Sequence, residues 1–334
     1  MKIAIVKLSS LGDVLHALPV AHALRRHFPE AHLTWIVEAR EFAILKGHPD
    51  LDSVVPVDTR LWRRLIWRPA GAVEVGHKVS RLTERIRRAR FDVAIDLQGL
   101  IKSGLLTAYT GAPLRIGFAF GRCREPLNAL FTNRRVTPPP EAVHIVDQNL
   151  SLLAPLGVKA STPVFHVPSE SAAEQRIEEF LAEQGVKPRD RLVALNPGAG
   201  RPSKRWPVEP FGRVAERLAV EAGARVLLLW GPDEEAMARS IAARMTSRPI
   251  LAPPTTISEL SALLRRCALM VASDTGPLHL AAAVGTPCLG LYGPTHADRN
   301  GPYGPRCRGL RSPSGALAAI SPDDVFAAAM ELLE

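Results

Sequence analysis

An acidic side chain stands where the first apolar run of the chain ends. Asp13 closes the segment 7–13 (KLSSLGD), which follows the apolar run 3–6 and opens a helical pattern. Small residues such as Ser10 and Gly12 let a ligand approach the backbone closely, and a helix amino terminus favours negative charge. Asp13 therefore has two interpretations: it stabilises the first helical turn, or it is a general base that removes a proton from a bound ligand.

A loop that contains glycine and lysine follows an apolar run in the second half of the chain. In the segment 196–207 (NPGAGRPSKRWP), Gly198 and Gly200 can present backbone amides to an anion, and Lys204 adds a positive charge. The spacing is not that of a P-loop. The alternative is a flexible turn that ends where Pro207 starts a helix.

Two further carboxylates follow apolar runs in the same half. Asp274 can accept sugar hydroxyls, and the amides of Thr275 and Gly276 can hold a pyrophosphate at the start of a helix. Glu234 can take ribose hydroxyls. For the segment of Asp274 the alternative is a helix cap. For Glu234 it is an acidic first turn that complements the helix dipole. His279 alone is more typical of a core or capping histidine.

The elements that must position these residues alternate between apolar runs and amphipathic segments. This alternation predicts parallel sheets covered on both faces. In such sheets ligands bind beyond the carboxyl ends of the strands, which is where the candidate residues fall. We expect strands at 3–6, 33–37, 53–57, 93–97, 115–118, 192–196, 225–230, 269–272 and 288–291, and helices at 14–27, 81–90, 208–222, 233–243, 257–265 and 277–284.

Two such series are separated by the loop-like segment 154–169, and 334 residues is the length of two domains. Their charges differ. Residues 1–168 hold 23 Lys and Arg against 14 Asp and Glu, whereas residues 169–334 hold 19 of each. The basic half favours an anionic partner: a nucleic acid, a phosphorylated ligand or an anionic membrane surface. Within it, residues 59–68 interleave arginines with Trp62 and Trp67, which suits a partner that is anionic at one end and apolar at the other.

Composition and motifs exclude several classes of protein. The chain is 46% hydrophobic and 22% charged, which excludes a disordered chain or a small disulfide scaffold. Its four cysteines lie far apart without a CxxC pair, which fits a reducing cytoplasm, and the apolar run before Lys7 is too short for a signal peptide. No zinc spacing or GxSxG elbow occurs. Asp50 and Asp52 form a DxD pattern, but it precedes a strand, so we expect no metal there.

Five segments span nearly the whole chain in order: VKLSSLGDVLHALP (6–19), VAIDLQGLIKSGLL (93–106), REPLN (124–128), KRWP (204–207) and VASDTGPLHLAAAVGTPCLGLYGPT (271–295). Together they resemble the heptosyltransferases of glycosyltransferase family 9, which build the inner core of bacterial lipopolysaccharide. SLGD with DTGxxH is specific to the family. TRLWRR, LQGLIKS and REPL favour the heptosyltransferase I branch.

The resemblance implies a GT-B fold, in which two Rossmann-like α/β domains face a central cleft. It implies an acceptor-binding domain at 1–160, a donor-binding domain at 170–320 and a final helix, 323–334, that returns to the first domain. The activity implied is inverting transfer of L-glycero-D-manno-heptose from ADP-heptose to a Kdo residue of Kdo-lipid A. No cofactor or metal is expected, and the enzyme would be cytoplasmic and peripheral at the inner membrane.

Carried over by position, the resemblance assigns roles to most of the candidate residues. Asp13 is the expected base and Lys204 the diphosphate contact. Family members can place hydroxyl residues where Ala199 and Gly200 stand, so backbone amides would replace side chains there. The donor-binding positions are Gly198, Ala199, Gly200, Lys204, Glu234, Asp274, Thr275, Gly276 and His279; the acceptor-binding positions are Ser10, Gly12, Arg60, Arg63, Arg64 and Arg124.

Three alternatives remain open on the sequence. One is another transferase of the same family with a different donor or acceptor. A second is a nucleotide-sugar epimerase, which would share the architecture but need no acceptor. The third is a nucleic-acid-binding module that uses the basic half, although the chain holds no RNP, zinc-finger or clear helix-turn-helix pattern, so we expect no nucleic-acid partner.

Overall fold

The computed structural model describes residues 1–65, 71–159 and 162–334. The side chains of Arg63, Gly71 and Ala72 also lie outside the description. The chain divides into two compact units, Met1–Pro168 and Ser169–Glu334, and each is described by itself. The division falls inside the segment 154–169 that the sequence predicts as a connecting loop.

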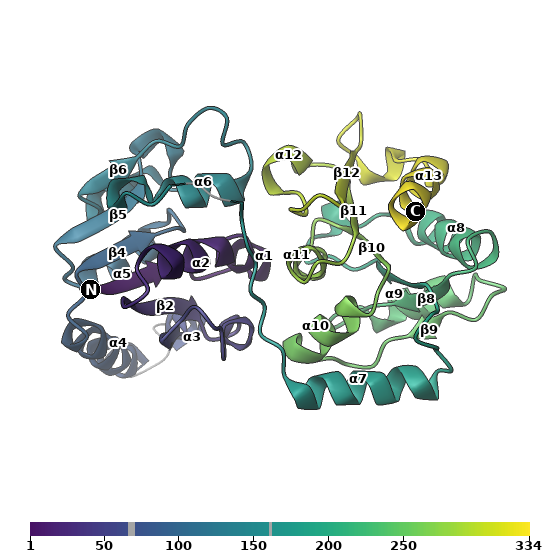
Figure 1. Cartoon of the computed structure of the whole chain (residues 1–334), viewed down its shortest axis with the longest axis horizontal. Helices are drawn as coiled ribbons and strands as arrows, with labels where there is room; N and C mark the ends of the chain where they lie inside the picture. The colour runs from purple at the N-terminus through teal and green to yellow at the C-terminus, as the bar shows by residue number, and fades with distance from the viewer. Residues whose placement is uncertain (66–70, 160–161) are drawn as a thin grey trace. The chain divides into compact units, whose positions relative to one another are not determined.

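The first unit is built on a six-stranded parallel sheet of order β3-β2-β1-β4-β5-β6 (Figure 1). The inner strands are almost wholly buried, as expected for a parallel sheet with helices on both faces. The strands are β1 Lys2–Val6, β2 His32–Glu38, β3 Ser53–Val57, β4 Val93–Asp96, β5 Leu114–Phe118 and β6 Arg134–Val136. The helices are α1 Leu11–Leu15, α2 Leu18–His27, α3 Thr59–Leu65, α4 Gly71–Arg88, α5 Ile101–Tyr109 and α6 Ile145–Ser151.

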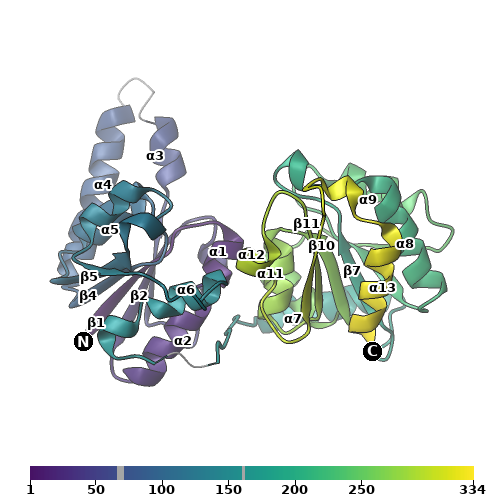
Figure 2. The same cartoon turned by 90° about the horizontal axis from the view of Figure 1, so that it is seen from above.

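Helices cover both faces of this sheet. Figure 2 shows α3, α4 and α5 on one face and α2 and α6 on the other. Under α4 and α5, a core cluster joins Val6 of β1, Ile36 of β2 and Ala94 of β4 to Ile86 and Leu106 of those helices. This burial fixes the carboxyl ends of β1, β3, β4 and β5 along one edge of the sheet, and the loops at that edge carry the candidate residues.

The second unit repeats the plan with a six-stranded parallel sheet of order β12-β11-β10-β7-β8-β9. Its strands are β7 Leu192–Asn196, β8 Arg225–Leu228, β9 Ile250–Leu251, β10 Leu269–Ser273, β11 Cys288–Tyr292 and β12 Cys307–Arg311. Its helices are α7 Ser171–Glu183, α8 Val208–Val220, α9 Glu235–Ala242, α10 Ile257–Arg265, α11 Gly276–Ala283, α12 Ala297–Asn300 and α13 Pro322–Leu333. The fold class predicted from the sequence is confirmed.

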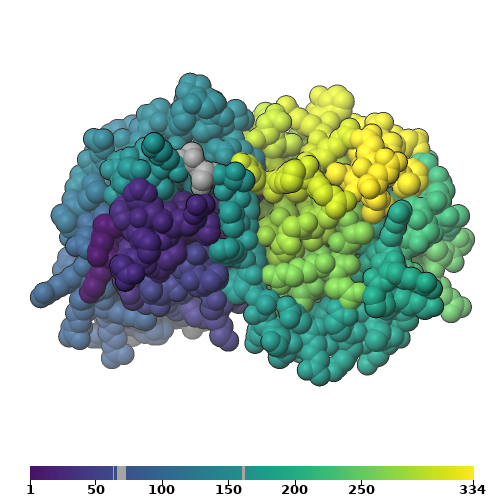
Figure 3. Space-filling model, in the orientation of Figure 1, coloured from purple at the N-terminus to yellow at the C-terminus, as the bar shows by residue number. Residues whose placement is uncertain are grey.

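The helix α13 corrects one expectation. We expected residues 323–334 to return to the first domain, but the helix packs in the second unit against α8, β10 and β11. The reason is its apolar side: Val325, Ala328, Ala329 and Leu333 are buried in the same cluster as Phe211 of α8. In the space-filling view the C-terminal part of the chain, coloured yellow, lies against the green surface of the second unit (Figure 3).

The elements depart from the sequence prediction at several places. Helix α4 begins ten residues before the predicted 81–90, and α3, α5, α6, α7 and α12 were not predicted. The predicted helix 14–27 is two helices, α1 and α2, because Pro19 has no N–H to donate and its ring clashes with the carbonyl of Leu15 in a continuous helix. The short strands β6, β9 and β12 were not predicted. Among the described residues, no helix combines the length and the apolar character that a membrane crossing requires.

Candidate functional site

Asp13 lies in α1, directly beyond the carboxyl end of β1. Its Oδ2 accepts hydrogen bonds from the backbone N–H of Ser10 at 3.0 Å and from the Ser10 hydroxyl at 3.2 Å. The same oxygen lies 3.5 Å from Nη1 of Arg124, and the Asp13 side chain is 23% exposed. The helix-capping contact is therefore present, yet the carboxylate also reaches solvent beside a second candidate, Arg124. Gly12 is buried behind it.

Neighbouring charges keep this carboxylate ionised. Burial raises the pKa of Asp13, but the charges of Lys7 and Arg124 and the hydrogen bonds from Ser10 outweigh burial and hold the pKa below its ordinary value. Lys7 is itself buried, and its Nζ donates to the carbonyl of Leu97 at 2.7 Å. Asp13 is thus negatively charged at neutral pH and available to accept a proton.

Gln98, which the sequence analysis did not single out, holds the loop that carries Asp13. Its Oε1 accepts the backbone N–H groups of Leu8 and Ser9 at 3.0 and 3.2 Å, and the residue is only 3% exposed. Because these two amides precede α1 directly, the side chain of Gln98 fixes where α1 begins. It lies in the segment LQGLIKS, but the contact joins positions about ninety residues apart.

A fully buried carboxylate holds Gln98 in turn. Asp96 accepts hydrogen bonds from the backbone N–H groups of Gln98 and Gly99, at 2.8 and 3.1 Å, and from the Ser103 hydroxyl at 2.9 Å. Asn128 donates to it at 2.6 Å. Burial raises the pKa of Asp96 above its ordinary value, with these four donors opposing the shift. Such a network is stable only when every member has its partner.

The same turn positions Arg124. The carbonyl of Gly99 accepts the N–H of Glu125 at 2.9 Å, and Glu125 accepts the N–H of Ile101 at 2.6 Å. Gly99 has φ +70°, and a Cβ there would lie 3.2 Å from the backbone N of Arg124. Only glycine fits this approach without strain. The buried turn after β4 therefore fixes the positions of both Asp13 and Arg124.

We expect Gln98→Leu to lower kcat about tenfold for the heptose transfer that the sequence resemblance implies. The KM for the sugar donor, whose expected binding residues lie in the second unit, should stay unchanged. The substitution leaves two buried amides without an acceptor and releases the loop before α1, at a cost of about 1–3 kcal/mol for each amide. Steady-state kinetics and thermal melting measure the two effects. Gln148→Leu is the matched control, since that side chain donates to the carbonyl of Val143 in an exposed hydrogen bond within its own segment. Equal effects of the two substitutions on kcat would contradict a positioning role for Gln98.

The structure describes the side chains of two of the four arginines in the segment 59–68. Arg60 and Arg64 are exposed on α3, which follows the carboxyl end of β3. Arg63 lies in the same helix, but its side chain is outside the described residues, as are Ile66, Trp67 and Arg68.

A buried glutamate anchors the start of α3. Glu38 at the end of β2 accepts hydrogen bonds from the backbone N–H and the hydroxyl of Thr59. It also pairs with Nζ of Lys102 at 3.1 Å. Lys102, a partly exposed cation at the same sheet edge, was not among the predicted residues.

In the second unit, Asp274 gathers two of the predicted donor-binding residues. Its Oδ2 lies 2.6 Å from Nζ of Lys204 and its Oδ1 lies 3.0 Å from Nε2 of His279. Burial raises the pKa of Asp274, but hydrogen bonds and charge from His279 and Lys204 outweigh burial and lower it well below its ordinary value. The cation and the carboxylate therefore form one charged pair at the carboxyl edge of the sheet, between the loops after β7 and β10.

The start of α11 completes this edge. Thr275 is the N-cap residue and Gly276 the first residue of the helix, with Pro277 in its first turn. The first amides of a helix have no acceptor within it, so they remain available to an anion. Asn196 at the end of β7 donates to the Thr275 hydroxyl at 3.4 Å, which ties the two loops together.

Glu234 lies against the glycine loop. Its carboxylate accepts the N–H of Gly231 at 3.1 Å and lies 3.8 Å from Nη2 of Arg205. The Glu234 carboxylate occupies the space that a Cβ at Gly198 would fill, so a larger residue there would have to displace this side chain. The carbonyl of Ala199 accepts a hydrogen bond from Arg205 at 2.9 Å. Gly200, in contrast, faces open space.

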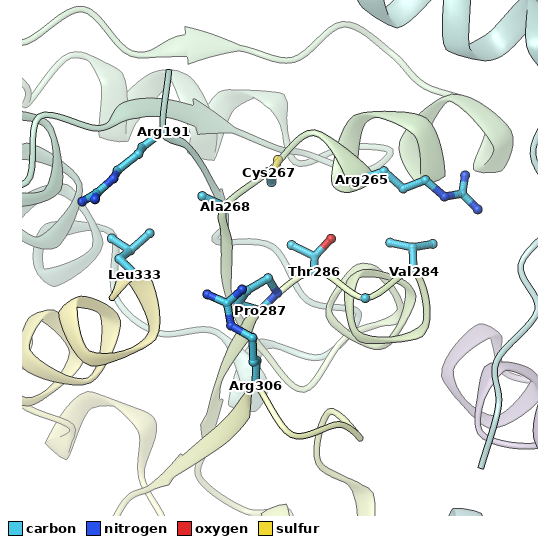
Figure 4. Close-up of a pocket in the computed structure, with 10 residues that line it drawn as sticks. Arg191, Arg265, Cys267, Ala268, Val284, Thr286, Pro287, Arg306 and Leu333 are labelled. Atoms are coloured by element: carbon cyan, nitrogen blue, oxygen red, sulfur yellow. The ribbon is translucent and has the colours of Figure 1, made fainter. Parts of the chain in front are cut away.

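A cavity of about 300 Å³ lies at the other edge of the second sheet (Figure 4). Residues at the starts of β7, β10, β11 and β12 line it, including Arg191, Arg265 and Arg306. Figure 4 shows the guanidinium groups of Arg191 and Arg265 pointing away from each other, so the three arginines do not converge on one anion. The cavity is separate from the residues around Asp274.

Comparison with known proteins shows which family and which solved structures the chain resembles. Residues 79–328 match the profile of glycosyltransferase family 9 (heptosyltransferase). Lipopolysaccharide heptosyltransferase 1 of Pseudomonas aeruginosa is 32% identical over 314 residues, which are 91% of this chain and 82% of that protein. The structure of E. coli heptosyltransferase WaaC with ADP has a TM-score of 0.83 at 27% identity and covers 99% of this chain and 100% of that one. The structure of the same enzyme with ADP-2-deoxy-2-fluoro heptose has a TM-score of 0.80 at 28% identity and covers 99% of both chains.

Proposed function

The chain belongs to glycosyltransferase family 9, the heptosyltransferase family, and from that premise we propose that it transfers L-glycero-D-manno-heptose from ADP-heptose to a Kdo residue of Kdo-lipid A. The observation that carries the proposal is the ionised Asp13 beside Arg124 at the edge of the first sheet. Asp13 can take up a proton, and the neighbouring Arg124 can bind the acidic groups of the substrate that receives the sugar. The likeness to structures with ADP and with an ADP-heptose analogue supports the nucleotide-sugar donor.

In the proposed reaction, Asp13 removes the proton of a Kdo hydroxyl as that oxygen attacks the anomeric carbon of heptose. The bond between this carbon and the diphosphate oxygen breaks on the opposite face, so the configuration inverts and the leaving charge stays on ADP. The Lys204 ammonium and the first amides of α11 stabilise that charge. Asp274, held by Lys204 and His279, accepts heptose hydroxyls, and Glu234 accepts those of the ribose.

Kdo-lipid A carries carboxylates and phosphates above its acyl chains, and the excess of basic residues in the first unit matches these acidic groups. We assign Arg60, Arg63, Arg64 and Arg124 to the acidic groups, with Ser10 and Gly12 close to the reacting hydroxyl. Trp62, on α3 between these arginines, is partly exposed but packs against the core cluster of Val6 and Ile36, so the exposed Arg60 and Arg64 carry the assignment. We therefore propose that α3 contacts the anionic surface of the inner leaflet, where the acceptor resides.

The test of the proposed function is mass spectrometry of Kdo-lipid A after incubation with ADP-heptose and the purified protein. We expect the acceptor to gain one heptose and ADP to be released in equal amount. ADP-glucose with the same acceptor tests whether another donor is used. Release of free sugar without Kdo-lipid A would point to a nucleotide-sugar epimerase, and absence of any heptose adduct would refute the proposal.

We expect EDTA to leave the transfer rate unchanged, because Lys204 and helix amides supply the positive charge that a metal gives other transferases. The DxD residues, Asp50 and Asp52, precede β3 and so lie at the opposite end of the sheet from Asp13. Initial rates in EDTA and in added Mg²⁺ measure this. A rate that vanishes in EDTA and returns with Mg²⁺ would contradict a metal-independent reaction.

A further inference from the structure

Three side chains from distant parts of the first unit converge away from the Asp13 edge. They are His22 in the middle of α2, Asp50 in the turn before β3, and His166 in the segment that precedes the end of the unit. The Asp50 Oδ2 lies 3.4 Å from Nδ1 of His22 and 2.7 Å from Nδ1 of His166. The three ligand atoms all lie within 4.8 Å of one another.

These distances suit a small transition-metal ion. Zn²⁺ binds imidazole nitrogen and carboxylate oxygen at about 2.0–2.2 Å, so ligand atoms at tetrahedral positions stand about 3.3–3.5 Å apart. The His22–Asp50 separation already has this value. The His166–Asp50 contact is a hydrogen bond, and His166, 38% exposed, has room to give up that bond for a metal.

His22 shows that the cluster is short of a partner. Its Nδ1 is buried and has no hydrogen-bond partner among the described residues, although it faces the Asp50 carboxylate. A buried polar nitrogen without a partner costs stability. A cation bound between the two imidazoles and the carboxylate gives Nδ1 of His22 a partner and so removes that cost.

The surroundings hold Asp50 in place. Its backbone N–H donates to Nδ1 of His48 at 3.2 Å, and its carbonyl accepts a hydrogen bond from Arg25 at 3.2 Å. The side chain of Asp50 is 8% exposed, which strengthens its attraction for a cation.

We propose that His22, Asp50 and His166 form a Zn²⁺ site, with the fourth position open to water. Bound there, the ion fastens the segment around His166 to α2 and to the turn before β3, and water takes the position that a fourth side chain fills in closed structural sites. Sequence spacing does not reveal the site, because its ligands are 28 and 116 residues apart. The proposal departs from the expectation that Asp50 holds no metal, which considered only the DxD pattern and not the two histidines. The site is separate from the proposed transfer reaction, since it lies at the end of the sheet where β3 begins.

The test is equilibrium dialysis of the full chain, free of any polyhistidine tag, against buffered ZnCl₂, with bound metal counted by mass spectrometry. We expect one Zn²⁺ per chain, and at least tenfold weaker binding in His22→Gln, His166→Gln and Asp50→Asn. His27→Gln is the matched control, because His27 is an exposed residue of the same helix. We also expect CoCl₂ to give the visible absorption of tetrahedral Co²⁺ in wild type and not in His166→Gln.

Thermal melting gives an independent readout. Zn²⁺ at a hundredfold excess over its dissociation constant should raise the melting temperature of wild type by roughly 5 °C and leave that of His166→Gln unchanged. His166 is partly exposed, so this variant should fold. Failure of the wild type to bind Zn²⁺, or equal binding by the His166→Gln variant, would overturn the site. Neither result depends on heptose transfer, which is assayed separately.

Discussion

Asp13→Asn should lower kcat for heptose transfer by about 10²–10⁴-fold, the usual contribution of a general base. The amide oxygen of asparagine can still accept the backbone N–H of Ser10, so the start of α1 is retained. The substitution therefore separates the two roles that Asp13 combines, because it removes the base and keeps the cap. Single-turnover transfer to Kdo-lipid A measures the chemical step, and calorimetry should show unchanged affinity for ADP-heptose.

Two further measurements sharpen this result. Asp147→Asn, which changes an acidic residue in the first turn of α6, is the matched control and should keep full activity. Because the pKa of Asp13 lies below its ordinary value, the group stays ionised as the pH falls from 8 to 5, and kcat/KM should lose no activity through it over that range. Full turnover by Asp13→Asn would leave Asp13 with only the capping role.

Lys204→Met should raise the KM for ADP-heptose and lower kcat, together reducing kcat/KM by about 10²–10³-fold. The substitution removes a charge that neutralises the departing diphosphate, an effect comparable with the loss of one preorganised donor in other enzymes. Initial-rate kinetics with varied donor measure both parameters. Lys187→Met, at an exposed position of the same unit, is the control and should have no effect.

The ion pair with Asp274 provides the sharper test of Lys204. Removing the lysine also leaves the Asp274 carboxylate without its cation, so a purely structural role predicts that Asp274→Asn partly rescues Lys204→Met. If Lys204 acts on the diphosphate, the double variant stays at least as inactive as the single one. Rescue of kcat/KM to the level of Asp274→Asn alone would show that the pair serves only the fold.

The sequence identified most of the fold because the inner strands are apolar on both faces. The run 192–196 is buried along its whole length and was predicted with its observed bounds. The strands β6 and β12 were not predicted, because neither is an apolar run. Both lie at sheet edges, where polar residues such as Arg134 and Arg308 are tolerated. The amphipathic pattern of α13 shows that one side is covered, but not which surface covers it.

The candidate residues that follow strands were predictable, whereas their supports were not. Asp274 and Lys204 each stand in a glycine-containing loop after an apolar run, and parallel topology brings such loops to one edge. Gln98 and Glu38 are buried polar residues whose partners lie far away in the chain. No local pattern reveals such contacts, because their energy depends on donors that only the folded sheet brings near.

The placement of α13 bears on how the protein is made. Every strand of the second sheet leaves the ribosome before the helix whose Val325 and Ala329 cover β10 and β11. During translation the first unit can fold alone, while the nascent second sheet shows an uncovered apolar face. That interval is when a chaperone has most to bind, and mutations that weaken α13 should be seen first as poor yield in the cell.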